Sequence, residues 1–245
     1  MPLTFRILPL AIVLGACRSP PRLAVQVDKN LPANGETVIG AGGLLEFRLA
    51  VPHASAAITC DGETNEEDWI TIAARTGAFV DAVSQRPSIP HSEARFLWDD
   101  KAFYLLLYAA DIDIRACGGA SGPEPGDDVF FFSVVTDGGV ELNAVFSASG
   151  AVWGVVRRDG QPEQKWKPSA LGVESDGTLN DPEDDDEEWV VEAAIPWDIL
   201  DIRPGRDTVL RIALKRCDTP KFATTRCGSW GEDFAGRVTG VVELQ

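Results

Sequence analysis

The feature that most constrains this chain is a series of short segments rich in β-branched and aromatic residues, each bounded by glycine, aspartate or proline. Such segments favour β-strands. Turn signals such as TDGG (136–139) and RDGQ (158–161) separate several of them. Helical periodicity is confined to residues 66–74 and 197–200. We therefore predict an all-β, antiparallel β-sandwich of immunoglobulin-like type with one or two short helical turns. The segments read EARFLWDD, AFYLLLYAA, DVFFFSVV, VELNAVFSAS, VWGVVRR, EWVVEAAIP, TVLRIALKR and VTGVVEL.

The N-terminus has the pattern of a secretory signal peptide, with Arg6 followed by an apolar run from residue 7 to residue 14. That run is too short to cross a bilayer, which needs about 20 apolar residues. It ends in Leu-Gly-Ala-Cys, which resembles the bacterial lipobox, whose cysteine is acylated after cleavage. The resemblance implies that residues 1–16 are removed, that Cys17 is lipidated and that the protein is anchored in the cell envelope. Arg18 in place of an aspartate favours the outer membrane.

The expected organisation follows from these two patterns. Residues 17–56 form a lipidated tether with extra strands, including the apolar runs at 23–27 and 44–51, and residues 57–245 form the sandwich. The chain carries 22 lysine and arginine residues against 38 aspartate and glutamate residues, a formal net charge of −16. This acidity argues against a nucleic-acid partner and against electrostatic docking on anionic lipid, so the lipid alone attaches the protein to a membrane.

The cysteines predict disulfides. Four remain besides Cys17, and an even number in an exported chain indicates two bridges. Cys217 and Cys227 flank a short loop and form the expected local pair, which leaves Cys60 to pair with Cys117. Four cysteines allow three connectivities, so the pairing stays open at this point.

Three motifs in a fixed order carry a family resemblance. The chain reads D-G-x-x-x-E-x-x-W at 61–69, L-W-D-D-x-x-x-Y at 97–104 and V-E-A-A-I-P-W at 191–197. In this order the chain resembles the family 9 carbohydrate-binding module, part of the DOMON-like sandwich superfamily, over residues 57–245. The resemblance implies a carbohydrate-binding β-sandwich without catalytic activity.

The first motif also has a physical interpretation of its own. An Asp-Gly pair supplies a turn, and Trp69 on the apolar side of a short helical turn is expected to plug the end of the sandwich. Glu63, Glu67 and Asp68 are expected to be solvated charges.

The resemblance names candidate sugar-binding residues. Family members hold a sugar ring between two tryptophans, with polar side chains on its hydroxyls. Asp127 matches the aspartate of the family's W-x-x-D-S-V-E-I-F strand, although its tryptophan position falls on Glu124. Trp230 lies near the position of the second tryptophan. Trp153 and Trp166 are alternative platforms or ordinary packing residues, and any platform must present a ring face to solvent.

The acidic run NDPEDDDEE at 180–188 is the most concentrated charge in the chain. Calcium prefers oxygen ligands, and members of the resembled family often hold calcium, so Asp184, Asp185 and Asp186 are candidate calcium ligands. The run contains no D-x-D-x-D-G loop, and a charged loop in water is the alternative.

Catalytic signatures are missing from the sequence. Neither G-x-S-x-G nor H-E-x-x-H occurs, and both histidines, His53 and His91, lie in proline-flanked segments. The single methionine is lost with the signal peptide, which argues against the haem ligation of some DOMON-like domains. The sequence thus predicts a non-catalytic carbohydrate-binding lipoprotein. The alternative is a structural or protein-interaction lipoprotein of the envelope that has lost the sugar clamp.

Overall fold

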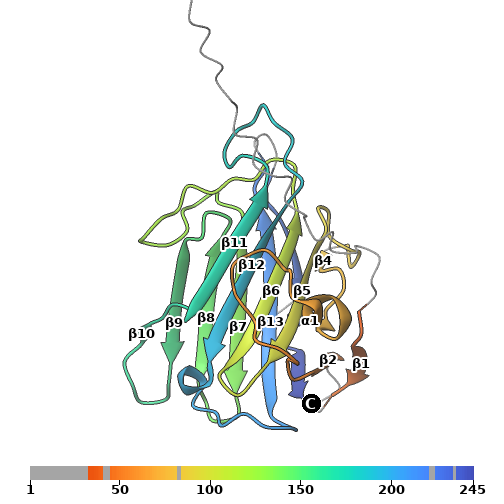
Figure 1. Ribbon diagram of the computed structural model, residues 1–245, viewed down its shortest axis with the longest axis vertical. Helices are drawn as coiled ribbons and strands as arrows, with labels where there is room; N and C mark the ends of the chain where they lie inside the picture. The colour runs from red at the N-terminus through yellow and green to blue at the C-terminus, as the bar shows by residue number, and fades with distance from the viewer. Residues whose placement is uncertain (1–32, 41–44, 82–83, 221–223, 234–235) are drawn as a thin grey trace, which may run out of the picture.

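The computed structural model of the chain describes residues 33–40, 45–81, 84–220, 224–233 and 236–245. The lipobox with Cys17 and the apolar run at 23–27 lie outside these residues. Two β-sheets pack face to face in the described part of the chain (Figure 1). No helix within the described ranges has the length and apolar character needed to cross a membrane.

The larger sheet has ten strands in the order β1-β2-β15-β13-β7-β8-β9-β10, with β14 on β13 and β4 on β14. Its pairs are antiparallel except β2 with β15, which run parallel. The strand bounds are β1 Glu36–Ile39, β2 Leu45–Val51, β4 Val80–Asp81, β7 Val129–Thr136, β8 Glu141–Ser147, β9 Val152–Arg157, β10 Gln164–Lys165, β13 Val209–Asp218, β14 Arg226–Trp230 and β15 Gly240–Leu244.

The smaller sheet has five antiparallel strands in the order β11-β12-β6-β5-β3. One short helix, α1 at Glu67–Thr71, and a 3₁₀ turn at Trp197–Leu200 complete the regular structure of the described residues. This confirms the predicted all-β sandwich with two short helical turns. The strand bounds are β3 Ala74–Arg75, β5 Ser92–Trp98, β6 Ala102–Ala110, β11 Ala170–Asp176 and β12 Glu188–Pro196.

The segment assigned to the tether contributes to the sandwich. β2 forms a ladder with β15, and Leu49 and Val51 on β2 are buried in the core between the sheets. The sandwich described by the structure therefore includes strands before residue 57.

The outer face of the five-stranded sheet is covered by residues 52–73, called here the cover segment. Trp69 on α1 is fully buried against Leu97, Tyr104 and Leu106, which face away from the other sheet. This explains why β6 and β12 read as nearly continuous apolar runs, since both of their faces are covered. The structure confirms that Trp69 is structural, but the ring lies on the outer face of the five-stranded sheet and not at the end of the sandwich.

Hydrogen bonds hold the cover segment in place. The carboxylate of Asp68 accepts the backbone N–H and the hydroxyl of Ser55, each at 2.6 Å. Asp68 is 6% exposed, so its assignment as a solvated charge is wrong. Glu192 on β12 accepts the N–H groups of Asp61 and Gly62 at 3.1 and 2.8 Å. The first motif therefore closes the cover over the sheet.

The expected local disulfide is present, because Cys217 on β13 lies directly opposite Cys227 on β14 and the two are bridged. The expected Cys60–Cys117 bridge is wrong, since both of these cysteines are free. Cys60 lies in the cover segment near Glu192, whereas Cys117 follows β6 and its Sγ lies 3.5 Å from Oδ1 of Asn180. The two thiols thus occupy separate parts of the fold.

Candidate functional site

The outer face of the ten-stranded sheet carries exposed aromatic rings. β7 contains three consecutive phenylalanines, and side chains on a strand alternate between its two faces. Phe130 and Phe132 therefore enter the core, with 0% and 1% of their surface exposed, while Phe131 faces outward and is 39% exposed.

The strand register builds a row across the sheet from Phe131. Lys215 on β13 pairs with Phe131, Phe131 pairs with Val145 on β8, and Val145 pairs with Trp153 on β9. Trp153 is 44% exposed. The ammonium of Lys215 lies 5.3 Å from the centroid of the Phe131 ring, a cation–π arrangement. We call these four residues the aromatic row.

Polar side chains lie beside the aromatic row. Two residues along the strands, Ser133 on β7 pairs with Asn143 on β8. The amide of Asn143 donates to Glu141 at 2.6 Å. Both rows line an open groove of about 250 Å³, and Glu232 contributes a carboxylate to it. We call this the outer groove.

The outer groove suits a ring-shaped ligand that has an apolar face and a polar edge. Aromatic faces can pack against an apolar C–H face, whereas hydroxyl, amide, ammonium and carboxylate groups can hydrogen-bond with hydroxyls at the ring edge. Ligand sites commonly combine such apolar walls with a few placed polar groups. The groove therefore offers the apolar and polar contacts that a ring with an apolar face and a polar edge requires.

Trp153 is the predicted platform residue that reaches solvent, but Trp230 does not. Trp230 pairs with Leu214, faces the core and is 5% exposed. Its ring lies between Phe47 and Phe96, with centroids 6.2 Å from each. Its assignment as a sugar platform is wrong, because its position in the ladder directs it inward.

Trp166 is also a packing residue. It is 6% exposed and belongs to the core between the sheets. A Cβ atom at Gly154 would lie 2.7 Å from the Trp166 ring, so the glycine leaves the space that this ring fills. The sequence left Trp166 as either a sugar platform or an ordinary packing residue, and the structure supports packing.

Asp127 folds a loop instead of lining the outer groove. It is 5% exposed, and its carboxylate accepts the backbone N–H groups of Cys117, Gly118 and Glu124 at 2.7 to 3.0 Å. A carboxylate engaged in this way has little capacity left for sugar hydroxyls. Its assignment as a sugar ligand is therefore wrong.

The structure does not gather Asp184, Asp185 and Asp186 into one site. Asp186 is 2% exposed and accepts the N–H groups of Ile114 and Thr178 at 2.6 and 2.8 Å, whereas Asp185 is exposed. Asp186 therefore ties the acidic run to the end of the sandwich. The expected calcium site on these three residues has no support in the geometry.

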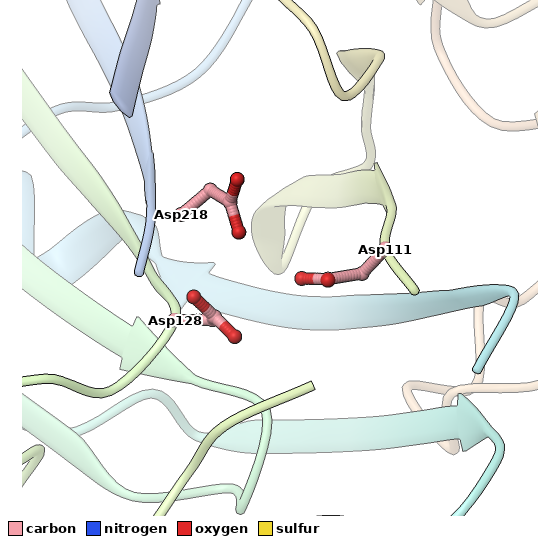
Figure 2. A group of neighbouring side chains, drawn as sticks. All are labelled: Asp111, Asp128 and Asp218. Atoms are coloured by element: carbon pink, nitrogen blue, oxygen red, sulfur yellow. The ribbon is translucent and has the colours of Figure 1, made fainter. Parts of the chain in front are cut away.

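Carboxylates do come together at the same end of the sandwich, in Asp111, Asp128 and Asp218. Figure 2 shows the three side chains converging from separate segments, and one oxygen of each lies within 4.8 Å of the others. All three are buried. The guanidinium of Arg216 bonds to Asp111 and lies 3.6 Å from Asp218.

The electrostatics of these three aspartates follow from burial. Asp128 accepts the N–H groups of Arg115 and Thr219, each at 2.7 Å. Burial, with the negative charge of Asp111, raises the pKa of Asp128 to about 7. Burial also raises the pKa of Asp111, although Arg216 opposes that shift. Arg216 supplies positive charge at this cluster, and Arg226 bonds to Asp218 at 3.2 Å, so the group is an ion network at the end of the core.

The sequence reasoning missed Phe131, Asn143 and Lys215 as parts of one surface. A signal was present, because three consecutive phenylalanines in a strand cannot all face the same side. The pairing of β7 with β13 gave no comparable signal, because these strands are far apart in the chain. The aromatic row forms only because the fold pairs strands that are distant in the chain.

Comparison with known proteins places the fold. Neither a family model nor a curated protein matches the sequence. A solved structure of a candidate carbohydrate-binding protein from Bacteroides uniformis ATCC 8492 matches with a TM-score of 0.59 and 13% identity, over 81% of this chain and 99% of that chain.

A family 9 carbohydrate-binding module from Caldicellulosiruptor kristjanssonii matches in two complexes at 12% identity. The cellotriose complex has a TM-score of 0.52 and covers 81% of this chain and 93% of that chain. The glucose complex has a TM-score of 0.53 and covers 81% and 95%. The chain thus contains a domain with the fold of a family 9 carbohydrate-binding module.

Proposed function

We propose that this protein binds carbohydrate without catalysis, and that it does so in the outer groove with Trp153 as the stacking platform. The observation that carries the proposal is the aromatic row, in which Trp153 and Phe131 are held in solvent on one rigid sheet face. Ser133 and Asn143 supply hydrogen-bonding groups beside the rings.

The structural neighbours support this proposal at the level of fold. One neighbour is a family 9 carbohydrate-binding module seen with cellotriose and with glucose. Function still depends on the site and not on the fold alone. In this chain the candidate platforms Trp166 and Trp230 are buried and cannot stack on a sugar, so recognition is assigned to Trp153.

The test is binding of the full chain to a panel of soluble polysaccharides, followed by the Trp153→Ala variant. We expect the variant to bind at least tenfold more weakly, a change of about 1.4 kcal/mol. Ile70→Ala is a matched control, because Ile70 is 42% exposed but lies on α1, over the opposite sheet. Equal binding by the wild type and Trp153→Ala would contradict the proposal.

If no polysaccharide in the panel binds, the alternative function is favoured, in which this envelope protein binds another protein. Exposed tryptophan and phenylalanine are also typical of protein interfaces. The same two variants separate the functions, because a protein partner lost with Trp153→Ala but kept with Ile70→Ala would place that partner on the outer groove.

We also propose that the protein is exported and anchored in the bacterial outer membrane through lipid on Cys17. The lipobox at residues 14–17 supports this, and the Cys217–Cys227 disulfide suits an oxidising compartment. Metabolic labelling with a fatty acid should depend on Cys17 and disappear in Cys17→Ser. Labelling that persists in this variant would contradict the anchor.

A further inference from the structure

We propose that residues 57–66 of the cover segment form a pH-sensitive latch on the five-stranded sheet, which is closed while Glu192 carries a proton and opens more often once Glu192 is ionised. The latch lies over the sheet opposite to the outer groove, so this inference does not depend on the proposed function. It rests on how one turn docks on the sheet and on two buried carboxylates.

The Asp61-Gly62 turn of the latch docks at one position on the sheet. Gly172 on β11 and Glu192 on β12 are cross-strand partners, and the turn lies against both. A Cβ atom at Gly172 would lie 2.2 Å from the carbonyl carbon of Asp61 and 2.2 Å from the nitrogen of Gly62. The turn therefore occupies the space that a side chain at Gly172 would fill. This contact defines the closed position of the latch.

Glu192 holds the docked turn through its side chain. Its Oε2 atom accepts the N–H groups of Asp61 and Gly62 at 3.1 and 2.8 Å. Glu192 is 0% exposed, and its Oε1 atom is buried without a hydrogen-bond partner among the described residues. A buried carboxylate that is ionised and has one unpaired oxygen is unfavourable, and a proton removes that charge.

Glu66, within the latch, repeats this pattern. Its Oε1 atom accepts the N–H of Thr59 at 2.8 Å, whereas its Oε2 atom is buried and has no hydrogen-bond partner in the described part of the chain. Two carboxylates with unpaired buried oxygens thus lie on the two sides of the contact between latch and sheet. Their mutual repulsion is smallest when one of them is protonated.

The groups around Glu192 favour its protonated form. Burial raises its pKa to about 7, the N–H of Gly62 opposes this shift, and the charge of Glu66 adds to it. Arg95 lies two strands away from Glu192, where it is engaged by Glu93 and by the carbonyl of Trp69. The titratable and charged groups that surround Glu192 are Cys60, Asp61 and Glu66 on the latch, Glu174 on β11, Tyr104 and Tyr108 on β6, and Arg95 on β5.

The two ends of the latch are fixed, so it can open while the sandwich stays folded. Before the latch, the N–H groups of Ser55 and Ala56 donate to the carboxylate of Asp68 at 2.6 and 3.3 Å. After it, Trp69 is fully buried, and its carbonyl accepts from Arg95 at 2.8 Å. Opening is therefore a local event confined to the segment between these two anchors.

The direction of the pH effect follows from proton linkage. The closed latch binds the proton of Glu192 with a pKa of about 7, and the open latch binds it with the usual pKa of 4.5. The closed state is fully favoured below pH 4.5 and loses this stabilisation as the pH rises through 7. The open population should grow by about 20-fold from pH 5.5 to pH 7.5 and change little from pH 7.5 to pH 8.

The thiol of Cys60 reports the opening, because it lies within the latch and close to Glu192. The experiment treats the full chain, as Cys17→Ser, with a pyridyl disulfide reagent between pH 5.5 and pH 8. Peptide mass analysis gives the rate constant of Cys60 divided by that of the exposed Cys117, which corrects for the pH dependence of thiol chemistry. We expect this ratio to rise at least tenfold from pH 5.5 to pH 7.5.

Matched variants test the two features that hold the latch. Glu192→Gln keeps an acceptor for Gly62 without a charge, so the ratio should stay within twofold of its value at pH 5.5. Glu63→Gln changes an exposed acid of the same segment and should behave as the wild type. Gly172→Ala places a methyl group against the turn and should raise the ratio at least tenfold at pH 5.5.

Hydrogen exchange separates local opening from unfolding of the whole domain. Peptides from residues 57–66 should exchange faster at pH 7.5 than at pH 5.5 after correction for the intrinsic rate, while peptides from β7 and β8 keep their protection. An equal loss of protection in β7 and β8 overturns the latch. A thiol ratio that is flat or falls with pH overturns it as well, and so does an undiminished rise in Glu192→Gln.

Discussion

The two outer faces of this sandwich both carry aromatic side chains, but only one of them is left open. The five-stranded sheet is covered by residues 52–73, and Trp69 beneath the cover is fully buried. Trp153 on the ten-stranded sheet keeps 44% of its surface exposed. The difference shows that an aromatic residue in this fold is structural where a second layer covers it, and available to a ligand where none does.

The charged side chains of the two outer faces also differ in how far they are buried. Under the cover, the guanidinium of Arg95 bonds to Glu93 at 2.9 Å and donates to the carbonyl of Trp69 at 2.8 Å. These charged groups are almost completely buried and have partners. In the outer groove, Lys215 and Glu232 remain partly exposed. The charged groups of the outer groove therefore remain accessible to solvent.

Replacement of the covered tryptophan should have the largest effect. Trp69→Ala removes a fully buried ring and leaves a cavity between α1 and the sheet. We expect the free energy of unfolding to fall by about 3–5 kcal/mol, measured by urea denaturation. A loss below about 1 kcal/mol would show that the cover contributes little to the fold.

Thiol chemistry should distinguish the free cysteine near the cover from the exposed one. Burial, followed by the charges of Glu192, Glu66 and Asp61, raises the pKa of Cys60 to about 12. Cys117 is exposed. In a Cys17→Ser background at pH 8, an alkylating reagent should modify Cys60 roughly 50-fold or more slowly than Cys117.

Peptide mass analysis of the labelled protein measures both rates. Resistance of both residues until reductant is added would instead indicate a Cys60–Cys117 bridge, contrary to the structure.

The cover should also make stability depend on pH. Burial raises the pKa of Glu192 from its usual 4.5 to about 7. The folded state then binds a proton more tightly than the unfolded chain, so this stabilisation is present at low pH and is lost as the pH rises through 7. Asp128, whose pKa is also raised to about 7, acts in the same direction.

We expect the free energy of unfolding to fall by about 1–3 kcal/mol between pH 5 and pH 8, in urea titrations across that range. Glu192→Gln should flatten the slope, since the amide oxygen can still accept from Gly62 and carries no charge. Glu63→Gln, at an exposed position of the same segment, is the control and should leave the slope unchanged. Stability that rises from pH 5 to pH 8 would contradict the assignment.

The smallest effect on stability is expected at the open face. Trp153→Ala and Phe131→Ala should each change the free energy of unfolding by less than about 0.5 kcal/mol, because neither ring fills the core. Urea denaturation beside Trp69→Ala measures the contrast directly. A loss of several kcal/mol in either variant would mean that the open face is structural and would remove the distinction between the two faces.

Much of the fold could be predicted from local sequence. The short strands, the turn signals and the role of Trp69 all depend on neighbours within a few residues, and the structure confirms them. The disulfide between Cys217 and Cys227 was accessible for the same reason, since it joins adjacent strands across a short loop. The pairing of Cys60 with Cys117 failed because it depended on elimination and not on any local contact.

The candidate site was harder to predict from the sequence than the fold. Trp153 and Trp230 look alike in the sequence, each beside small or apolar residues, whereas Trp166 lies between two lysines and yet is buried. Their exposure is decided by which face of a strand they occupy and by what packs there, such as the space at Gly154 that Trp166 fills. A family pattern therefore pointed to Trp230 and Asp127, both of which the structure buries.

The sequence by itself determined the alternation of side chains along each strand, and with it an all-β sandwich that must place the middle phenylalanine of β7 outside the core. Only the tertiary structure decided that this ring lies in line with Trp153 and Lys215, and that Phe131 and Trp153 keep 39% and 44% of their surface exposed. The physical reason is that strand periodicity is a property of the backbone. Cross-strand register and coverage depend instead on contacts between segments that are distant in the chain.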